Sequence, residues 1–334
     1  MQEDKSATKI RKMVKKFAEA LAKLEKPALI SHIGPDGDAI GSQIALYFWF
    51  KNRGIEPLMF NDDPVPDNLT WLSGQEKIRR PAKELLDECD AILFIDGNDP
   101  LRFGNMAEYF SKTGKPLCLI DHHLDPPEGM FSEMLWDSGA SSTAYLVYTL
   151  FEETGPEAIS KEAAEALYTG IVTDTGSFRF DTVTEATHFA VGNIIKYGGI
   201  RPGEIYSRIY DDRTLSEYHL LGTTLKGIRL FCNEKVAVME VTEKLMSENG
   251  CSQDDLEGFV NYPLSIRGVV VSVLFYEREG RVKISLRGKS LVDLNHVARQ
   301  FDGGGHFNAA GAWHPGPVEK AVKDLIAEIS GLLS

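Results

Sequence analysis

The stretch Ser31-His-Ile-Gly-Pro-Asp-Gly-Asp-Ala-Ile-Gly-Ser42 places one histidine and two aspartates within seven residues, directly after the apolar run Pro27-Ala-Leu-Ile30. A short apolar run that gives way to Gly, Pro and Asp is typical of a buried strand, and the pattern over 38–53 is helical. Further apolar runs follow at 58–60, 91–95 and 116–120. This alternation predicts an α/β fold with a parallel sheet covered by helices on both faces.

The length of 334 residues predicts two domains, each large enough to bury its own core. We predict a first domain over 1–199, a helical linker over 200–225, and a smaller α/β domain over 226–334. Helical patterns at 142–153 and 161–172 complete the first domain. In the second, strands are expected at 235–241, 268–277 and 281–286, helices at 252–259, 293–301 and 317–333, and a further helix start directly after 306.

Composition limits the classes of function. A net charge of −13 argues against a protein that binds long duplex nucleic acid, because such binding depends on Lys and Arg. Four scattered cysteines without a CxxC pair predict reduced thiols. The first 26 residues are charged and lack an apolar signal core, and Val14, Phe17 and Leu21 recur at helical spacing. We therefore expect a cytoplasmic protein that begins with an amphipathic helix and has no membrane partner.

Aspartates and histidines follow several of the apolar segments. Asp96 follows Phe94-Ile95, Asp121-His122-His123 follows Leu119-Ile120, and Asp174 follows Ile171-Val172-Thr173. Because the carboxyl ends of parallel strands share one edge, where ligands bind, we expect these residues to converge there. Capping of the following helix is the alternative for any single aspartate, Asp38 included.

Four aspartates in one crevice would repel one another and raise one another's pKa values. Two divalent cations would balance their charge, and histidines would add neutral nitrogen ligands. Imidazole and carboxylate without thiolate favour Mn²⁺, with Co²⁺, Fe²⁺, Mg²⁺ and Zn²⁺ as alternatives.

Three segments of the first half and two of the second carry a resemblance. The former are His32 to Ser42, Asp121-His-His123 and Asp174-Thr-Gly-Ser-Phe178, and the latter are Ser285-Leu-Arg-Gly288 and Gly303-Gly-Gly-His-Phe-Asn-Ala-Ala-Gly311. In this order they resemble motifs I, III and IV of the DHH phosphoesterase superfamily and its DHHA1 domain. The resemblance covers nearly the whole chain and is strongest to the bacterial nanoRNase and pAp phosphatase group. It implies a parallel-sheet DHH domain and a DHHA1 domain with a mixed sheet.

The resemblance also implies which residues hold two metal ions. The ligands of the first ion would be His32, Asp36 and Asp96. The ligands of the second would be Asp38, Asp96, His122 and Asp174. Asp99 is the alternative to Asp96 as the shared ligand, because motif II has little sequence signature. His123 would lie beside the substrate phosphate, and Asp121 would orient the histidines.

In the second domain the resemblance implies a pocket for a terminal phosphate. Its residues would be Arg287, Gly303, Gly304, Gly305 and His306, since a glycine run permits close backbone approach and arginine offers a forked contact. Tyr262 and Phe307 are weaker candidates for stacking a base, and Arg179 for a further contact. Core packing is the alternative for the two aromatic residues.

The predicted function is hydrolysis of short 5′-phosphorylated oligoribonucleotides, of 3′-phosphoadenosine 5′-phosphate (pAp), or of both, by a water that two metal ions activate. Alternatives are a cyclic or linear dinucleotide phosphodiesterase, a soluble pyrophosphatase, a RecJ-like exonuclease and a catalytically inactive nucleotide-binding module. The glycine-rich tail argues against the pyrophosphatase, and the length and acidity of the chain argue against the RecJ-like enzyme. The oligomeric state is left open, and a homodimer is one of the alternatives.

Overall fold

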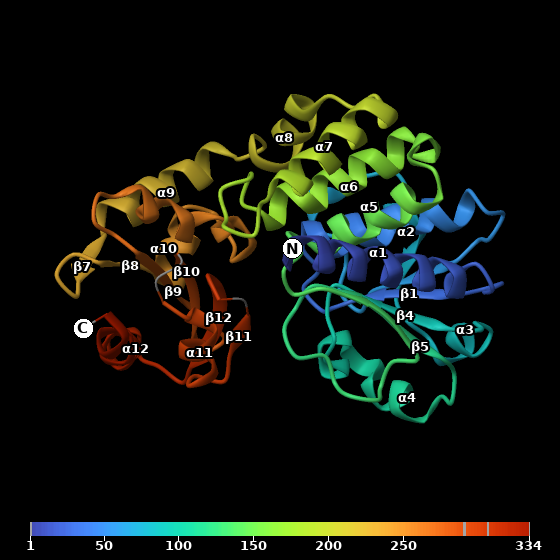
Figure 1. The fold of residues 1–334 in the computed structure, drawn as a ribbon. Coiled ribbons are helices and arrows are strands. Elements are labelled where there is room, and N and C mark those ends of the chain that lie inside the picture. The colour runs from blue at the N-terminus through green and yellow to red at the C-terminus, as the bar shows by residue number, and fades with distance from the viewer. Residues whose placement is uncertain (1, 290–291, 306, 334) are drawn as a thin grey trace. The chain divides into compact units, whose positions relative to one another are not determined.

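The protein divides into two compact units, Met1–Asp212 and Arg213–Ser334. The structure is a computed structural model, and it describes residues 2–289, 292–305 and 307–333, with side chains from residue 10 onward. Each unit contains one six-stranded sheet (Figure 1). The division falls inside the segment 200–225, for which we predicted a helical linker. The roles predicted for the separate domains stay predictions.

The sheet of the first unit has the strand order β3-β2-β1-β4-β5-β6, and every neighbouring pair runs parallel. Its strands are β1 (Ala28–Ser31), β2 (Leu58–Phe60), β3 (Ile78–Arg79), β4 (Ile92–Ile95), β5 (Leu117–Asp121) and β6 (Glu133–Trp136). The predicted parallel sheet is confirmed. The sequence did not predict β3 and β6, because these short edge strands bury too little apolar surface to show a run.

Helices cover both faces of this sheet. They are α1 (Gln2–Leu21), α2 (Gly37–Lys51), α3 (Lys83–Asp87), α4 (Ala107–Lys112), α5 (Thr143–Thr154), α6 (Lys161–Asp174), α7 (Glu185–Gly198) and α8 (Pro202–Tyr210), with 3₁₀ helices η1 (Asp67–Leu69), η2 (Gln75–Lys77), η3 (Pro100–Met106) and η4 (Pro156–Ala158). Leu29 and Leu93 belong to the core that includes α2 and α5, whereas Ile30 and Phe94 belong to the core that includes α3 and α4. The side chains of each strand thus alternate between two cores, as expected for a sheet buried on both faces.

Small residues set the distance between α2, α5 and α6. A Cβ atom on Gly41 of α2 would lie 2.4 Å from the carbonyl oxygen of Ala166 in α6. A Cβ atom on Gly170 of α6 would lie 2.5 Å from the Cβ of Ala144 in α5. Only glycine fits at these contacts, and the close packing brings the first turn of α2 beside the last turn of α6, where a Cβ on Gly37 would strike Thr173.

The sheet of the second unit has the order β11-β12-β10-β9-β8-β7. Its strands are β7 (Arg229–Phe231), β8 (Val236–Val241), β9 (Val271–Arg278), β10 (Arg281–Gly288), β11 (Gly304–Gly305) and β12 (Ala309–His314). Its helices are α9 (Leu215–Lys226), α10 (Glu243–Glu248), α11 (Leu294–Arg299), α12 (Val318–Leu333), η5 (Asp254–Leu256) and η6 (Phe259–Ser265). Strands β8 and β9 pair in parallel and the other pairs are antiparallel, which confirms the mixed sheet.

Two predictions in this unit were wrong. The helix predicted at 252–259 is only the short η5, because Gly258 takes a left-handed conformation with φ 78° and ends it. The helix start predicted after 306 is instead strand β12, which pairs with β10 over its whole length. The small residues Ala309 and Gly311 were misleading. They fit a helix, but they fit equally well in a strand that a neighbouring strand approaches closely.

The first helix packs as predicted over its described side chains. Val14, Phe17 and Leu21 of α1 are buried in the same core as α2 and α5. None of the helices that the structure describes combines the length and apolar character needed to cross a membrane. The cytoplasmic location stays a prediction.

The helix contacts predict a difference between two glycines. Gly41→Ala should destabilise the fold by about 1–3 kcal/mol, because the new methyl group overpacks against the backbone of α6. Gly192→Ala in α7, where a Cβ would meet open space, is the control and should stabilise the fold by about 0.4–1 kcal/mol. Urea denaturation measures both, and equal midpoints for the two variants would contradict the packing argument.

Candidate metal centre

The carboxyl ends of three neighbouring strands carry most of the predicted ligands. His32 directly follows β1, Asp96 directly follows β4, and Asp121 ends β5 with His122 behind it. This placement agrees with the expectation for a parallel sheet. The expectation was wrong for Asp174, which is the last residue of helix α6 and follows no strand.

All six predicted metal ligands lie in close groups. Within each group the ligand atoms are within 4.8 Å of one another, and the groups are His32 with Asp36 and Asp96, Asp38 with His122 and Asp174, and Asp96 with His122 and His123. Asp96 belongs to two of them. Asp99, the alternative, is exposed, and its carboxylate accepts a hydrogen bond from the Leu101 amide at 3.0 Å to cap η3. The division of the ligands between two ions stays a prediction.

The histidine rings are oriented by backbone carbonyls. Nδ1 of His32 lies 2.9 Å from the Ile33 oxygen, and Nδ1 of His122 lies 3.2 Å from the Ala140 oxygen. Because a carbonyl only accepts, each Nδ1 is the donor in this arrangement and each Nε2 presents a lone pair. The backbone therefore sets the tautomer that a metal ligand needs.

Each Nε2 atom faces carboxylates. Nε2 of His32 lies 3.5 Å from Oδ2 of Asp96, and Nε2 of His122 lies 3.4 Å from Oδ2 of Asp174 and 3.7 Å from Oδ1 of Asp96. Two ligand atoms about 2.1 Å from one ion would themselves lie about 3.0–3.5 Å apart. The spacing and the donor set both fit divalent cations.

Asp38 is held by the start of a helix. Its carboxylate accepts hydrogen bonds from the backbone amides of Thr143 at 2.6 Å and Ala144 at 2.8 Å, in the first turn of α5. Helix capping was the alternative role for Asp38. The residue that caps α2 is Asp36, whose carboxylate accepts hydrogen bonds from the Asp38 and Ala39 amides. A helix N-terminus favours a negative charge, so α5 offsets part of the cost of a charged Asp38 beside the other carboxylates.

The carboxylates perturb one another's protonation. Burial and the negative charges of Asp96 and Asp174 raise the pKa of Asp38 well above its usual range. Burial chiefly raises the pKa of Asp174 to about 6. Burial alone would also raise the pKa of Asp96, but the interaction with His32 and the charges of the histidines hold it well below its usual range. Such opposed shifts indicate a tightly coupled group of charges, as is common at functional sites.

Asp121 and His123 form a separate pair. Oδ1 of Asp121 lies 2.7 Å from Nδ1 of His123, and Oδ2 accepts a hydrogen bond from Nδ2 of Asn98 at 2.8 Å. Burial opposes protonation of His123, yet the hydrogen bond to Asp121 and the charge of Asp96 raise the pKa of His123 to about 9. The buried Asp121 is thus placed to orient His123 and keep it protonated.

Sequence reasoning missed several residues that support this site. Oγ1 of Thr143 donates to Oδ1 of Asp96 at 2.8 Å, and Oδ2 of Asp63 accepts from the Gly34 amide at 2.7 Å. The Ser-Ser-Thr run at 141–143 signals a helix start, since Ser142 caps α5, but nothing in that signal names Asp96 as a partner. Asn98 carries no signal beyond its position after Asp96.

The predicted phosphate pocket lies in the second unit. Strand β12 pairs with Arg287 on β10 through Ala309, and with Gly304 and Gly305 on β11. A Cβ on Gly303 would lie 2.2 Å from the Gly311 carbonyl oxygen, so this position requires glycine. His306 lies outside the described residues. The structure thus brings the arginine and the glycine run to one sheet, and phosphate binding there stays a prediction.

The weaker candidates lie elsewhere. Tyr262 and Phe307 are both exposed, which argues against the core-packing alternative for them. Arg179, in the first unit, donates from Nε to the Gly176 carbonyl oxygen at 2.7 Å.

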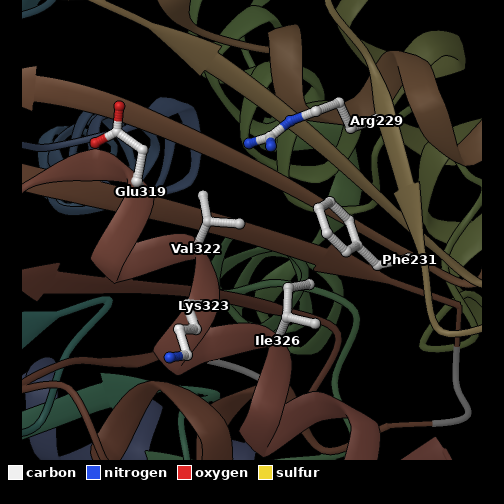
Figure 2. A pocket seen from close by; sticks show the side chains of 6 residues that line it. All are labelled: Arg229, Phe231, Glu319, Val322, Lys323 and Ile326. Carbon is white, nitrogen blue, oxygen red and sulfur yellow. The ribbon is translucent and has the colours of Figure 1, made fainter.

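A hollow in the second unit is lined by side chains of β7 and α12 (Figure 2). Its lining residues are Arg229, Phe231, Glu319, Val322, Lys323 and Ile326. It contains one carboxylate and no histidine, so it lacks the donors of a metal centre.

The comparisons with known proteins agree with the geometry. The family described as "DHH family, N-terminal domain" matches residues 27–171, and the "DHHA1 domain" matches 233–334. The bifunctional oligoribonuclease and PAP phosphatase NrnA of Thermus thermophilus is 32% identical over 297 residues, which are 88% of this chain and 86% of that protein. The protein of the same name from Bacillus subtilis is 29% identical and covers 84% of this chain and 87% of its own.

A solved structure shows the same fold. The crystal structure of an exopolyphosphatase-related protein from Bacteroides fragilis has a TM-score of 0.90 and 31% identity, over 96% of this chain and 97% of that chain. The chain therefore belongs to the DHH phosphoesterase family with a DHHA1 domain, as the sequence predicted. The two NrnA proteins named above are relatives of 29–32% identity. DHH phosphoesterases are metal-dependent, and the acidic and histidine groups of this chain could bind metal.

The raised pKa of Asp174 predicts how the metal-free protein responds to pH. A carboxyl whose pKa is higher in the folded than in the unfolded state lowers stability as pH rises from about 4 to about 6. Asp174→Asn removes this penalty, so in EDTA at pH 8 the variant should be more stable than the wild type by about 1–2 kcal/mol, with little difference at pH 4. Saturating Mn²⁺ should reverse the order, because the wild type binds it more tightly. Urea midpoints that are unchanged by the variant in EDTA would contradict the repulsion.

Proposed function

We propose that this protein is a phosphoesterase that uses two divalent metal ions, preferentially Mn²⁺, to hydrolyse short 5′-phosphorylated oligoribonucleotides and pAp. The observation that carries the proposal is the position of Asp96, which groups with His32 and Asp36 and also with His122, while His122 groups in turn with Asp38 and Asp174. A carboxylate shared between two groups of ligands is what a two-metal centre needs. The names of the NrnA relatives support this choice of substrates.

In the proposed reaction a water oxygen adds to phosphorus, and the bond from phosphorus to the leaving oxygen breaks in line. The bound ions would activate the water and neutralise charge on the phosphoryl oxygens. His123, kept protonated by Asp121, would donate a proton to the leaving oxygen or neutralise a phosphoryl oxygen. No covalent bond to the protein forms in this scheme.

The proposed role of the second unit is to hold a terminal phosphate. Arg287 would offer a forked contact, while Gly303, Gly304 and Gly305 would let the backbone amides approach the phosphate closely. A pocket that encloses one terminal phosphate would favour short substrates, which have few nucleotides beyond that phosphate. Manganese is preferred for the metal centre because the ligands are imidazoles and carboxylates without thiolate.

Four substrates test the proposed function. Purified protein with Mn²⁺ should release products from pAp and from a 5′-phosphorylated RNA dimer, while an RNA 24-mer reacts slowly and pyrophosphate does not react. The control is the Asp38→Ala, His122→Ala double variant, which should lose at least 100-fold in rate, on the order of what a two-metal centre supplies. Initial rates of nucleotide and phosphate release measure the outcome.

Two results would contradict the proposal. Equal rates for the wild type and the double variant would mean that the predicted ligands do not serve catalysis. Binding of pAp without any turnover would favour the inactive nucleotide-binding module. A polyphosphate substrate should be added, because the similar Bacteroides fragilis structure is described as exopolyphosphatase-related.

The pair of Asp121 and His123 predicts a pH-dependent effect. Asp121→Asn should return the pKa of His123 from about 9 toward its ordinary value of about 6.5, so that the ring is mostly neutral at pH 8. We expect kcat for pAp to fall about 10- to 30-fold at pH 8 and less than about twofold at pH 6. The same substitution added to His123→Gln should have little further effect. A loss that is equal at both pH values would instead indicate structural damage.

A further inference from the structure

The loop that follows β4 is fixed beside the first metal ligand. The amide of Ile33, next to His32, donates to the carbonyl oxygen of Arg102 at 2.6 Å. Asp99 caps the start of this loop, and Gly104 near its end has φ 71°, where a Cβ would strike the carboxylate of Asp62. These contacts hold the backbone of Arg102 in one position relative to His32.

The side chain of Arg102 is exposed at this position. Among the described residues no carboxylate lies within 4.0 Å of its guanidinium, although its backbone contacts the residue next to His32. Burial and, more weakly, the positive charge of Arg102 oppose protonation of His32 and His123, although the neighbouring aspartates raise the pKa of both rings overall. A cation at this place is neither neutralised by a neighbour nor needed to hold the loop, which is fixed through its backbone.

The charge of the metal centre indicates a role for the guanidinium of Arg102. The four aspartates predicted as ligands, Asp36, Asp38, Asp96 and Asp174, carry four negative charges, which two divalent ions would balance. The loaded centre would then be neutral, whereas a phosphate ester brings one or two further negative charges. Protonated His123 would supply one positive charge, and the guanidinium of Arg102 would supply a second in a forked geometry that matches phosphate oxygens.

We propose that Arg102 binds a non-bridging oxygen of the phosphoryl group that is attacked, as a substrate-binding residue of the metal centre in the first unit. The ligand class is a phosphate monoester or diester of a nucleotide. This inference rests on the proposed function and adds to it a phosphate contact outside both the predicted metal ligands and the predicted pocket around Arg287.

The test compares the wild type with three variants. Arg102→Ala removes the charge but leaves the backbone carbonyl that fixes the loop, so the variant should fold. Arg102→Lys keeps the charge without the fork. Arg11→Ala is the matched control, since Arg11 is an exposed arginine of α1 whose only recorded ion pair, to Glu153, spans 3.9 Å.

With Mn²⁺ and pAp, Arg102→Ala should lower kcat/KM by about 10- to 100-fold, Arg102→Lys by less, and Arg11→Ala not at all. Affinity for AMP, measured by calorimetry on the Mn²⁺-loaded protein, should fall in the same order. Affinity for Mn²⁺ itself, measured by calorimetry without nucleotide, should stay equal or increase for Arg102→Ala, because a cation beside the acidic ligands has been removed.

The outcomes separate this inference from the proposed function. Unchanged kcat/KM and unchanged AMP affinity in Arg102→Ala would overturn the inference while leaving an active wild-type enzyme in place. Weaker Mn²⁺ binding by Arg102→Ala would also overturn it, since the residue would then act by holding the metal ligands. If the wild type hydrolyses none of the substrates, the proposed function fails, and the AMP measurement still decides whether Arg102 binds phosphate.

Discussion

The repulsion among the carboxylates of the buried Asp38 and Asp96 and the partly exposed Asp174 is the constraint on which the first unit depends. Hydrogen bonds hold two of them in place: the amides at the start of α5 donate to Asp38, and the hydroxyl of Thr143 donates to Asp96. Asp174 has the least favourable position, because it ends α6, where the helix dipole adds negative potential. A charge on all three carboxylates at once therefore costs stability, and bound cations would offset that cost.

This arrangement requires close packing as much as chemistry. Asp38 and Asp174 belong to different helices, and they meet because Gly41 and Gly170 let those helices approach to backbone contact. The strands supply the remaining ligands from the opposite direction, through the common edge of β1, β4 and β5. The centre is thus assembled where a sheet edge meets two helix ends, so that a shift of any one layer would separate the ligands.

The sequence predicted the parts of this site that depend on local order. His32, Asp96 and His122 follow strands, and a strand end can be recognised from an apolar run. Asp174 was assigned to the right cluster for the wrong structural reason, because an apolar helix turn before an aspartate resembles a strand end. The partners Thr143 and Asn98 were missed, since contacts between residues far apart in sequence leave no periodic pattern. Strand β12 was misread for the same reason. Its small residues leave room for the backbone of β11, and the residues next to them in the sequence do not reveal this contact.

The exposure of Asp36 distinguishes the two groups of ligands. Asp36 faces solvent at the rim, whereas Asp38 and His122 are buried behind it. If each group holds one ion as proposed, the two ions differ in how fast they exchange with the surroundings. The ion held by Asp38 and His122 would stay bound through many turnovers. The ion held by Asp36 would dissociate and rebind as the free metal concentration changes. Control of the reaction by metal supply would then act through one half of the centre alone.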